Sequence, residues 1–151
     1  MPVTVVRLAI LVAASLLVCL FTWSGRRFVE MRRRQALAAA PLSAFPEASD
    51  VAGQSDPAKV RILAFSSADC RQCHQLQSPA LKRVLEARGP SISVVDIDAP
   101  GEPELAHRYH VLTVPTTVVL DAAGHAHAVN YGFADTGKLL EQVDAVLTEA
   151  S

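Results

Sequence analysis

The sequence predicts an α/β domain with a mixed sheet, preceded by one N-terminal transmembrane helix. Two observations support this division. The first is an uncharged, mostly apolar run of 18 residues from Leu8 to Gly25. The second is the alternation of short β-rich apolar segments with amphipathic helical segments over residues 58–151. The length of 151 residues leaves room for about one domain.

The composition and the charge exclude two classes of protein. Half of the residues are hydrophobic and 19% are charged, which is too apolar for a disordered chain. The net charge of −1 is a cancellation, because residues 1–40 carry six arginines and one acid, whereas residues 58–151 carry eight bases and eleven acids. Since the domain is mildly acidic, we expect no nucleic-acid partner.

The apolar run over residues 8–25 is interpreted as a membrane anchor, so that residues 1–25 form the first segment. Eighteen helical residues are about 27 Å long, close to the hydrocarbon thickness of a bilayer, and Trp23 lies where an interfacial aromatic residue is expected. A cleaved signal peptide is an alternative, although the run is long and arginines follow it. A core helix of the domain is another.

Arginines determine the expected orientation of the anchor. Five arginines follow the span within 11 residues, whereas Arg7 and the free amine precede it. Because positive flanks stay cytoplasmic, we expect a single-pass protein with its domain in the cytoplasm; the alternative is an extracytoplasmic domain. Residues 26–57 are expected to form an arginine-rich juxtamembrane segment, whose first part could be a short helix on anionic headgroups, and then a proline-punctuated linker.

The first half of the domain, which we place at residues 58–151, is expected to contain a strand, a helix and a strand. Residues 59–65 (KVRILAF) are apolar and β-rich. Over residues 71–87 apolar side chains recur at helical spacing, among them Leu76, Ala80 and Val84, and Gly89-Pro90 ends the helix. Residues 92–97 (ISVVDI) are the second expected strand.

The second half is expected to contain a helix, a β-hairpin and a last helix. Residues 102–109 form the short helix, and residues 116–120 and 126–131 form the hairpin around the turn at 122–125. Residues 136–147 carry an apolar helical face. The order β-α-β-α-β-β-α indicates a mixed sheet flanked by helices.

Two motifs give these elements a family resemblance. Cys70 and Cys73 stand at the first strand-to-helix junction, and Val114-Pro115-Thr116 precedes the third strand. With Phe65, Asp98 after the second strand and Gly132 after the last, this pattern resembles the thioredoxin family over residues 58–151. The resemblance implies a thioredoxin-like fold, with the proline in cis beside the cysteine pair. The family's first β-α unit would lie in the linker or be missing.

The chain also departs from the family pattern. Asp69 stands where the family has a tryptophan, and Arg71-Gln72 replaces the usual Gly-Pro. Ala64 occupies the position of the family's buried acid, and Val94 occupies that of the lysine that accompanies it. The helix proline, Pro79, comes one residue later than in the family. Without the acid, the resolving cysteine must lose its proton by another route, such as water or a histidine, and we expect slower turnover.

Cys70 and Cys73 are the expected redox-active pair. Cys70 opens a helix, so its sulfur lies near unpaired N–H groups and the positive end of the helix dipole. Arg71 also favours the thiolate, whereas Asp69 opposes it. We therefore expect Cys70 to attack and Cys73 to resolve the mixed disulfide; the alternative is two structural thiols. Cys19 lies in the apolar span and is expected to be inert.

The segment Val114-Pro115-Thr116 is the expected substrate-binding loop. A cis-proline lacks a backbone donor and fixes the loop. The resemblance implies that the loop faces the sulfurs, so that Val114 can offer backbone hydrogen bonds to an extended client segment. An ordinary trans turn proline is the alternative.

His74 completes a Cys-x-x-Cys-His pattern, which is also the motif of c-type haem attachment. The position of the motif after a strand in an α/β chain argues against haem. A zinc site made by both cysteines and a histidine lacks a second tight ligand pair. We therefore expect no bound cofactor and no metal.

Together these features predict a membrane-tethered thiol–disulfide oxidoreductase that acts as a reductase. Its expected partners are client proteins with disulfides and an upstream electron donor, such as a reductase or a membrane redox protein. The alternatives are an extracytoplasmic redox protein for cytochrome c or disulfide maturation, and a non-catalytic adaptor that keeps the fold.

Overall fold

The structure is a computed structural model that describes residues 2–39 and 58–149. The chain divides into two compact units, Met1–Arg34 and Gln35–Ser151. The linker expected in the later part of residues 26–57 lies outside the described residues from residue 40 onward.

Helix α1 (Pro2–Leu37) contains the apolar run. Its most apolar 18-residue window has a mean hydropathy of 2.5 and is not buried. By length and composition this helix could cross a membrane, although signal sequences share these properties. Its exposed leucines, valines and phenylalanines need an apolar surrounding, which a bilayer provides.

The arginine-rich segment continues α1 instead of forming a separate helix. Three contacts between residues four apart support the continuation. The guanidinium of Arg27 lies 4.7 Å from the ring centroid of Trp23, and that of Arg32 lies 5.1 Å from that of Phe28. Arg34 Nε donates to Glu30 Oε1 at 3.2 Å. The arginines therefore extend beyond the apolar run on the same helix.

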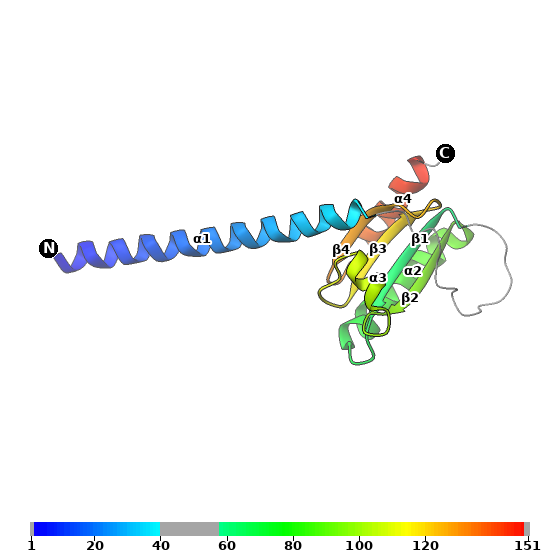
Figure 1. Cartoon of the computed structure of the whole chain (residues 1–151), viewed down its shortest axis with the longest axis horizontal. Coiled ribbons are helices and arrows are strands. Elements are labelled where there is room, and N and C mark those ends of the chain that lie inside the picture. Colours follow the sequence, from blue (N-terminus) through cyan, green and yellow to red (C-terminus); the bar gives the residue numbers. More distant parts are fainter. Residues whose placement is uncertain (1, 40–57, 150–151) are drawn as a thin grey trace. The chain divides into compact units, whose positions relative to one another are not determined.

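The domain contains a four-stranded mixed sheet (Figure 1). Its strands are β1 (Val60–Ser66), β2 (Ile92–Asp98), β3 (Thr116–Asp121) and β4 (Ala126–Tyr131), in the order β2-β1-β3-β4. Strand β1 pairs parallel with β2 and antiparallel with β3, and β3 pairs antiparallel with β4. Each expected strand is present, with bounds shifted by at most one residue.

Helical elements connect and cover the strands. They are the π-helical turn η1 (Cys73–Gln77), α2 (Ser78–Arg88), the 3₁₀ turn η2 (Gly89–Ser91), α3 (Pro103–Arg108) and α4 (Thr136–Glu149). The order β-α-β-α-β-β-α is confirmed. Residues Arg71 and Gln72 are already helical, so the predicted helix start at residue 71 is correct.

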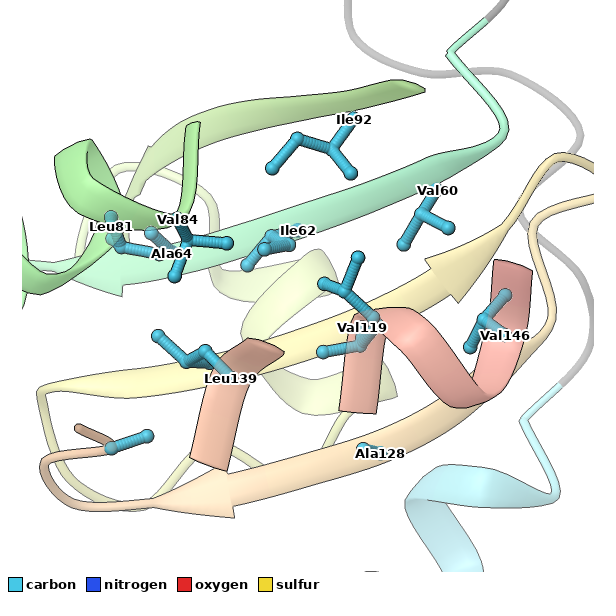
Figure 2. Close-up of a cluster of buried hydrophobic side chains, with 12 residues drawn as sticks. Val60, Ile62, Ala64, Leu81, Val84, Ile92, Val119, Ala128, Leu139 and Val146 are labelled. Carbon is cyan, nitrogen blue, oxygen red and sulfur yellow. The ribbon is translucent and has the colours of Figure 1, made fainter. Parts of the chain in front are cut away.

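Each face of the sheet contributes to a hydrophobic cluster. Successive side chains of β1 point to opposite faces. Ile62 and Ala64 pack with residues of α2 and α4 such as Val84 and Leu139 (Figure 2). Leu63 and Phe65 belong to the second cluster, which includes Leu105 and Tyr109 from the α3 region.

The expected burial of Leu76 is wrong. Its side chain is 48% exposed, whereas the polar Gln77 is 3% exposed. Gln77 lies four residues after Cys73 and three before Ala80, which are both buried, so Gln77 continues the buried face of the helix. Leu76 lies beside this face, and the expectation followed its apolar side chain. The late helix proline is accommodated because Pro79 lies in the first turn of α2.

Among the described residues of the domain, no strand precedes β1. The family's first β-α unit therefore has no counterpart within residues 58–149, and β2 is an edge strand of the described sheet. This edge matters for the site, because β2 carries an acidic side chain close to the cysteine pair.

Candidate active site

Cys70 and Cys73 form a disulfide at the junction between β1 and the following helix. Their Cα atoms are 5.3 Å apart. The turn that leads to them is closed by the Cys70 N–H, which donates to the Ser67 carbonyl at 3.0 Å. Cys70 is half-buried, whereas Cys73 is 3% exposed. A client sulfur can therefore reach the first cysteine more easily than the second.

The backbone around the pair favours the thiolate form of Cys70. The Cys73 N–H donates to Cys70 Sγ at 3.1 Å. An N–H directed at sulfur stabilises a thiolate more than a neutral thiol, and the start of a helix adds its positive dipole end. Arg71 and Asp69 are both exposed on either side, so solvent screens their opposing effects.

The π turn positions two polar side chains beside the cysteines. His74 Nε2 lies 3.2 Å from the Ala68 carbonyl, in the turn before Cys70. The Gln77 amide donates to the Ala134 carbonyl at 3.1 Å and accepts from the Ala134 N–H at 3.0 Å. Gln77 therefore fastens the helix that carries Cys73 to the segment after β4.

The loop before β3 lies at the same site. The Val114–Pro115 peptide bond is cis. The Pro115 carbonyl accepts a 2.9 Å hydrogen bond from the Gly132 N–H, and Gly132 has a φ of +87°, which a side chain would disfavour. The Thr116 hydroxyl is used within the loop, because it donates to the Thr113 carbonyl at 2.7 Å and the residue is fully buried.

A cavity of about 260 Å³ joins the cysteine and proline segments. It is lined by residues from β1, η1, α2, β2 and the proline loop: Ala64, Phe65, Ser66, Cys73, His74, Gln77, Ser78, Leu81, Asp96 and Pro115. The structure thus brings together Cys73 and Pro115, which are 42 positions apart in the sequence.

Sequence reasoning missed Asp96 and Gln77 as members of this site. The sequence signal for Asp96 is an acid inside the mostly apolar segment ISVVDI. Its relevance depends on strand register, because Asp96 is paired with Ala64 of β1. Gln77 lies at helical spacing from the buried Cys73, but a glutamine side chain gives no apolar signal for burial.

Three apolar side chains flank the site along the chain and are exposed. They are Leu76 of η1 at 48%, Leu112 before the proline loop at 62%, and Phe133 next to Gly132 at 41%. Exposed apolar side chains beside a reactive cysteine suit contact with another polypeptide.

The other histidines lie elsewhere. His125 and His127 contact Asp121 at the end of β3 opposite the proline loop. Within residues 2–39 and 58–149, no group of three or more His, Cys, Asp or Glu residues is arranged to hold a metal ion.

A scan of family models and a search of curated proteins found no match. Solved structures do match. A chloroplastic thioredoxin z is 25% identical, with a TM-score of 0.53 over 62% of this chain and 81% of that chain. The Drosophila melanogaster germline-specific thioredoxin Deadhead is 28% identical, with a TM-score of 0.51 over 58% and 81%.

A third match is a malaria parasite thioredoxin-2, which is 22% identical, with a TM-score of 0.53 over 58% of this chain and 82% of that chain. These similarities confirm the predicted thioredoxin-like fold. With the close cysteine pair, they support a thiol–disulfide oxidoreductase in general terms.

Proposed function

We propose that this thioredoxin-fold domain is a membrane-tethered thiol–disulfide oxidoreductase that reduces disulfides of client proteins through Cys70 and Cys73. The observation that carries the proposal is the asymmetry of the pair. Cys70 is the more accessible cysteine and its sulfur accepts the Cys73 N–H at 3.1 Å, whereas Cys73 is buried. This arrangement suits an attacking thiolate and a protected resolving thiol.

The reaction proceeds in two displacements. In the dithiol form, the Cys70 thiolate attacks one sulfur of a client disulfide, and the other client sulfur leaves as a thiolate that takes up a proton. The Cys73 thiol then loses its proton and attacks Cys70 Sγ, which releases the second client thiol. The Cys70–Cys73 disulfide remains, and two electrons have passed to the client. An upstream dithiol donor restores the reduced pair.

Client contact is proposed at the loop before β3. The Val114 backbone can pair with an extended client segment as one added strand. The exposed side chains of Leu112 and Phe133 provide apolar contact next to it. Thr116 supports this loop through its hydrogen bond to Thr113 and contributes no exposed surface.

The tether is proposed to be α1, with the domain in the cytoplasm. The unburied apolar window of α1 and the five arginines that follow it support this topology. A cytoplasmic location agrees with a reductase, because cytosolic thiols are kept reduced. An extracytoplasmic location would instead favour a role in cytochrome c or disulfide maturation.

Serine variants of the two cysteines test the function. In an assay with a disulfide-containing protein and a dithiol donor, Cys70→Ser should reduce turnover to the uncatalysed rate. Cys73→Ser should accumulate a covalent 1:1 complex with the client, which a reducing gel lane removes. Cys19→Ser is the matched control and should leave turnover unchanged. Full turnover by Cys70→Ser would contradict the proposal and favour a non-catalytic adaptor.

A further inference from the structure

The second displacement requires Cys73 to lose a proton, although this residue is only 3% exposed. Ala64 of β1 lines the same cavity as Cys73, but its methyl side chain cannot accept a proton. The proton must therefore leave through the cavity that Cys73 lines. We propose that Asp96 of β2 is the proton acceptor for Cys73, acting across this cavity. The inference rests on the proposed function.

Strand register brings Asp96 to the cavity. In the parallel pair of β1 and β2, Asp96 is the partner of Ala64. Ala64 belongs to the cluster beneath α2, where it lies near Leu81 and Val84 (Figure 2). Paired residues on neighbouring strands project to the same face. Because the Ala64 side chain is a single methyl group, space remains between Asp96 and the start of the helix.

The cavity can hold the water that the transfer needs. Its volume of about 260 Å³ greatly exceeds the roughly 10–15 Å³ that a cavity needs in order to hold one water molecule. Ser66, Ser78 and Gln77 supply polar lining. A water between Cys73 and Asp96 can pass the proton to the carboxylate, and the exposed Asp96 can then release it to solvent.

Other charged groups near Asp96 come from η1 and α2. Lys82 and Glu86 line a neighbouring pocket together with Asp96 but do not line the cavity of Cys73. His74 lines that cavity, and its Nε2 lies 3.2 Å from the Ala68 carbonyl. Asp96 is therefore the one carboxylate of the described chain that lines both the cavity with Cys73 and the more open pocket.

The transfer completes the resolving step. The Cys73 S–H proton passes to an Asp96 carboxylate oxygen, and the Cys73 thiolate attacks Cys70 Sγ. The bond between Cys70 and the client sulfur breaks, and the client thiolate takes a proton from water. Asp96 then returns its proton to solvent, so the carboxylate is unchanged over the cycle.

The resolving step can be measured alone in the full chain. A mixed disulfide of Cys70 with an aromatic thiol is formed, and release of that thiol is followed by stopped-flow absorbance. At neutral pH, Asp96→Asn should slow the release by about tenfold or more, less than the roughly 10²–10⁴-fold typical of a directly bonded general base, because this acceptor works through water. The deficit should shrink as pH rises, because hydroxide then removes the Cys73 proton directly.

Matched variants decide the assignment. Asp96→Glu should restore most of the rate, and Glu86→Gln, which changes only the neighbouring pocket, should leave it unchanged. Formation of the mixed disulfide by Cys70 should be equal in all variants. A wild-type rate of thiol release in Asp96→Asn would overturn the proposal. A tenfold slower release in His74→Gln but not in Asp96→Asn would overturn it as well. Failure of wild type to form any mixed disulfide would instead contradict the proposed function itself.

Discussion

Gln77 shows how one buried polar side chain holds the site together. Both ends of its amide are satisfied by the backbone of Ala134, with distances of 3.1 and 3.0 Å. Ala134 is itself 1% exposed, so no water can easily replace these bonds. Since Gly132, two residues earlier, bonds to the Pro115 carbonyl, Gln77 indirectly supports the substrate loop.

Replacing Gln77 by leucine should therefore destabilise the domain. The Ala134 N–H and carbonyl would be left buried without partners, at a cost of about 1–3 kcal/mol. Urea unfolding of Gln77→Leu measures this loss, with the exposed Gln75→Leu as the matched control. Equal unfolding midpoints for the two variants would show that the Gln77 hydrogen bonds add nothing to stability.

Individual site residues differ in how far the sequence predicts them. Cys70, Cys73 and Pro115 are recognisable because their spacing and neighbours form a known pattern. Asp96 is not recognisable, since its place in the site depends on which residue of the neighbouring strand it pairs with. Gln77 is the reverse case, because its spacing fits the buried helical face but its side chain is polar, so the sequence favours the apolar Leu76 instead.

At the scale of elements, hydrophobic periodicity was sufficient for the strands and the last helix. The alternation in β1 separates Ile62 and Ala64 from Leu63 and Phe65, and the two sets belong to different clusters. Periodicity follows apolar residues, however. In η1 the polar Gln77 occupies the buried helical face, so the apolar pattern misassigns burial in the element that carries Cys73.

Helices α2 and α4 are joined by a bidentate ion pair. Arg88 Nε and Nη2 donate to the two carboxylate oxygens of Asp144, each at 2.7 Å. The hydrogen bond from Arg88 is the main cause that lowers the pKa of Asp144 from its ordinary value of 3.8. Burial opposes this shift, and the charge of Arg88 adds a further lowering. The pair therefore favours the ionised carboxylate in the folded domain.

This pKa shift predicts a pH-dependent effect of Arg88→Gln. Because the folded-state pKa of Asp144 lies below its unfolded value, the pair stabilises the fold above pH 3.8 and loses this effect as pH falls through the folded-state pKa. Arg88→Gln should lower the thermal unfolding midpoint slightly at pH 7 and leave it unchanged near pH 2. The exposed Arg83→Gln on the same helix is the control. A lower unfolding midpoint of Arg88→Gln that persists near pH 2 would contradict the ion-pair explanation.

At the scale of the whole molecule, the near-neutral charge is an average of two different parts. Six arginines flank the apolar run, one before it and five after it, and the acidic excess lies in the domain. The order of strands and helices could be predicted from sequence, because each element carries its own pattern. The pairing of Asp96 with Ala64 could not, since register depends on packing between segments far apart in the sequence.

The distribution of arginines predicts the side of the membrane on which the domain lies. In a chain with its native cysteines replaced by serine, Ser151→Cys should resist a membrane-impermeant maleimide in intact cells and react after permeabilisation. Val3→Cys, at the opposite end of the span, should react in intact cells. The reverse labelling pattern would place the domain outside the cytoplasm and favour the maturation role.

The reduction potential of the Cys70–Cys73 pair tests the central claim most directly. It is measured on the full chain by equilibration in glutathione or dithiothreitol buffers, followed by alkylation and counting of free thiols. A reductase with this fold should titrate as one two-electron couple near about −270 mV, the value of thioredoxin. A potential near about −120 mV would contradict the direction of electron flow, and a pair that strong reductants leave oxidised would contradict a redox role.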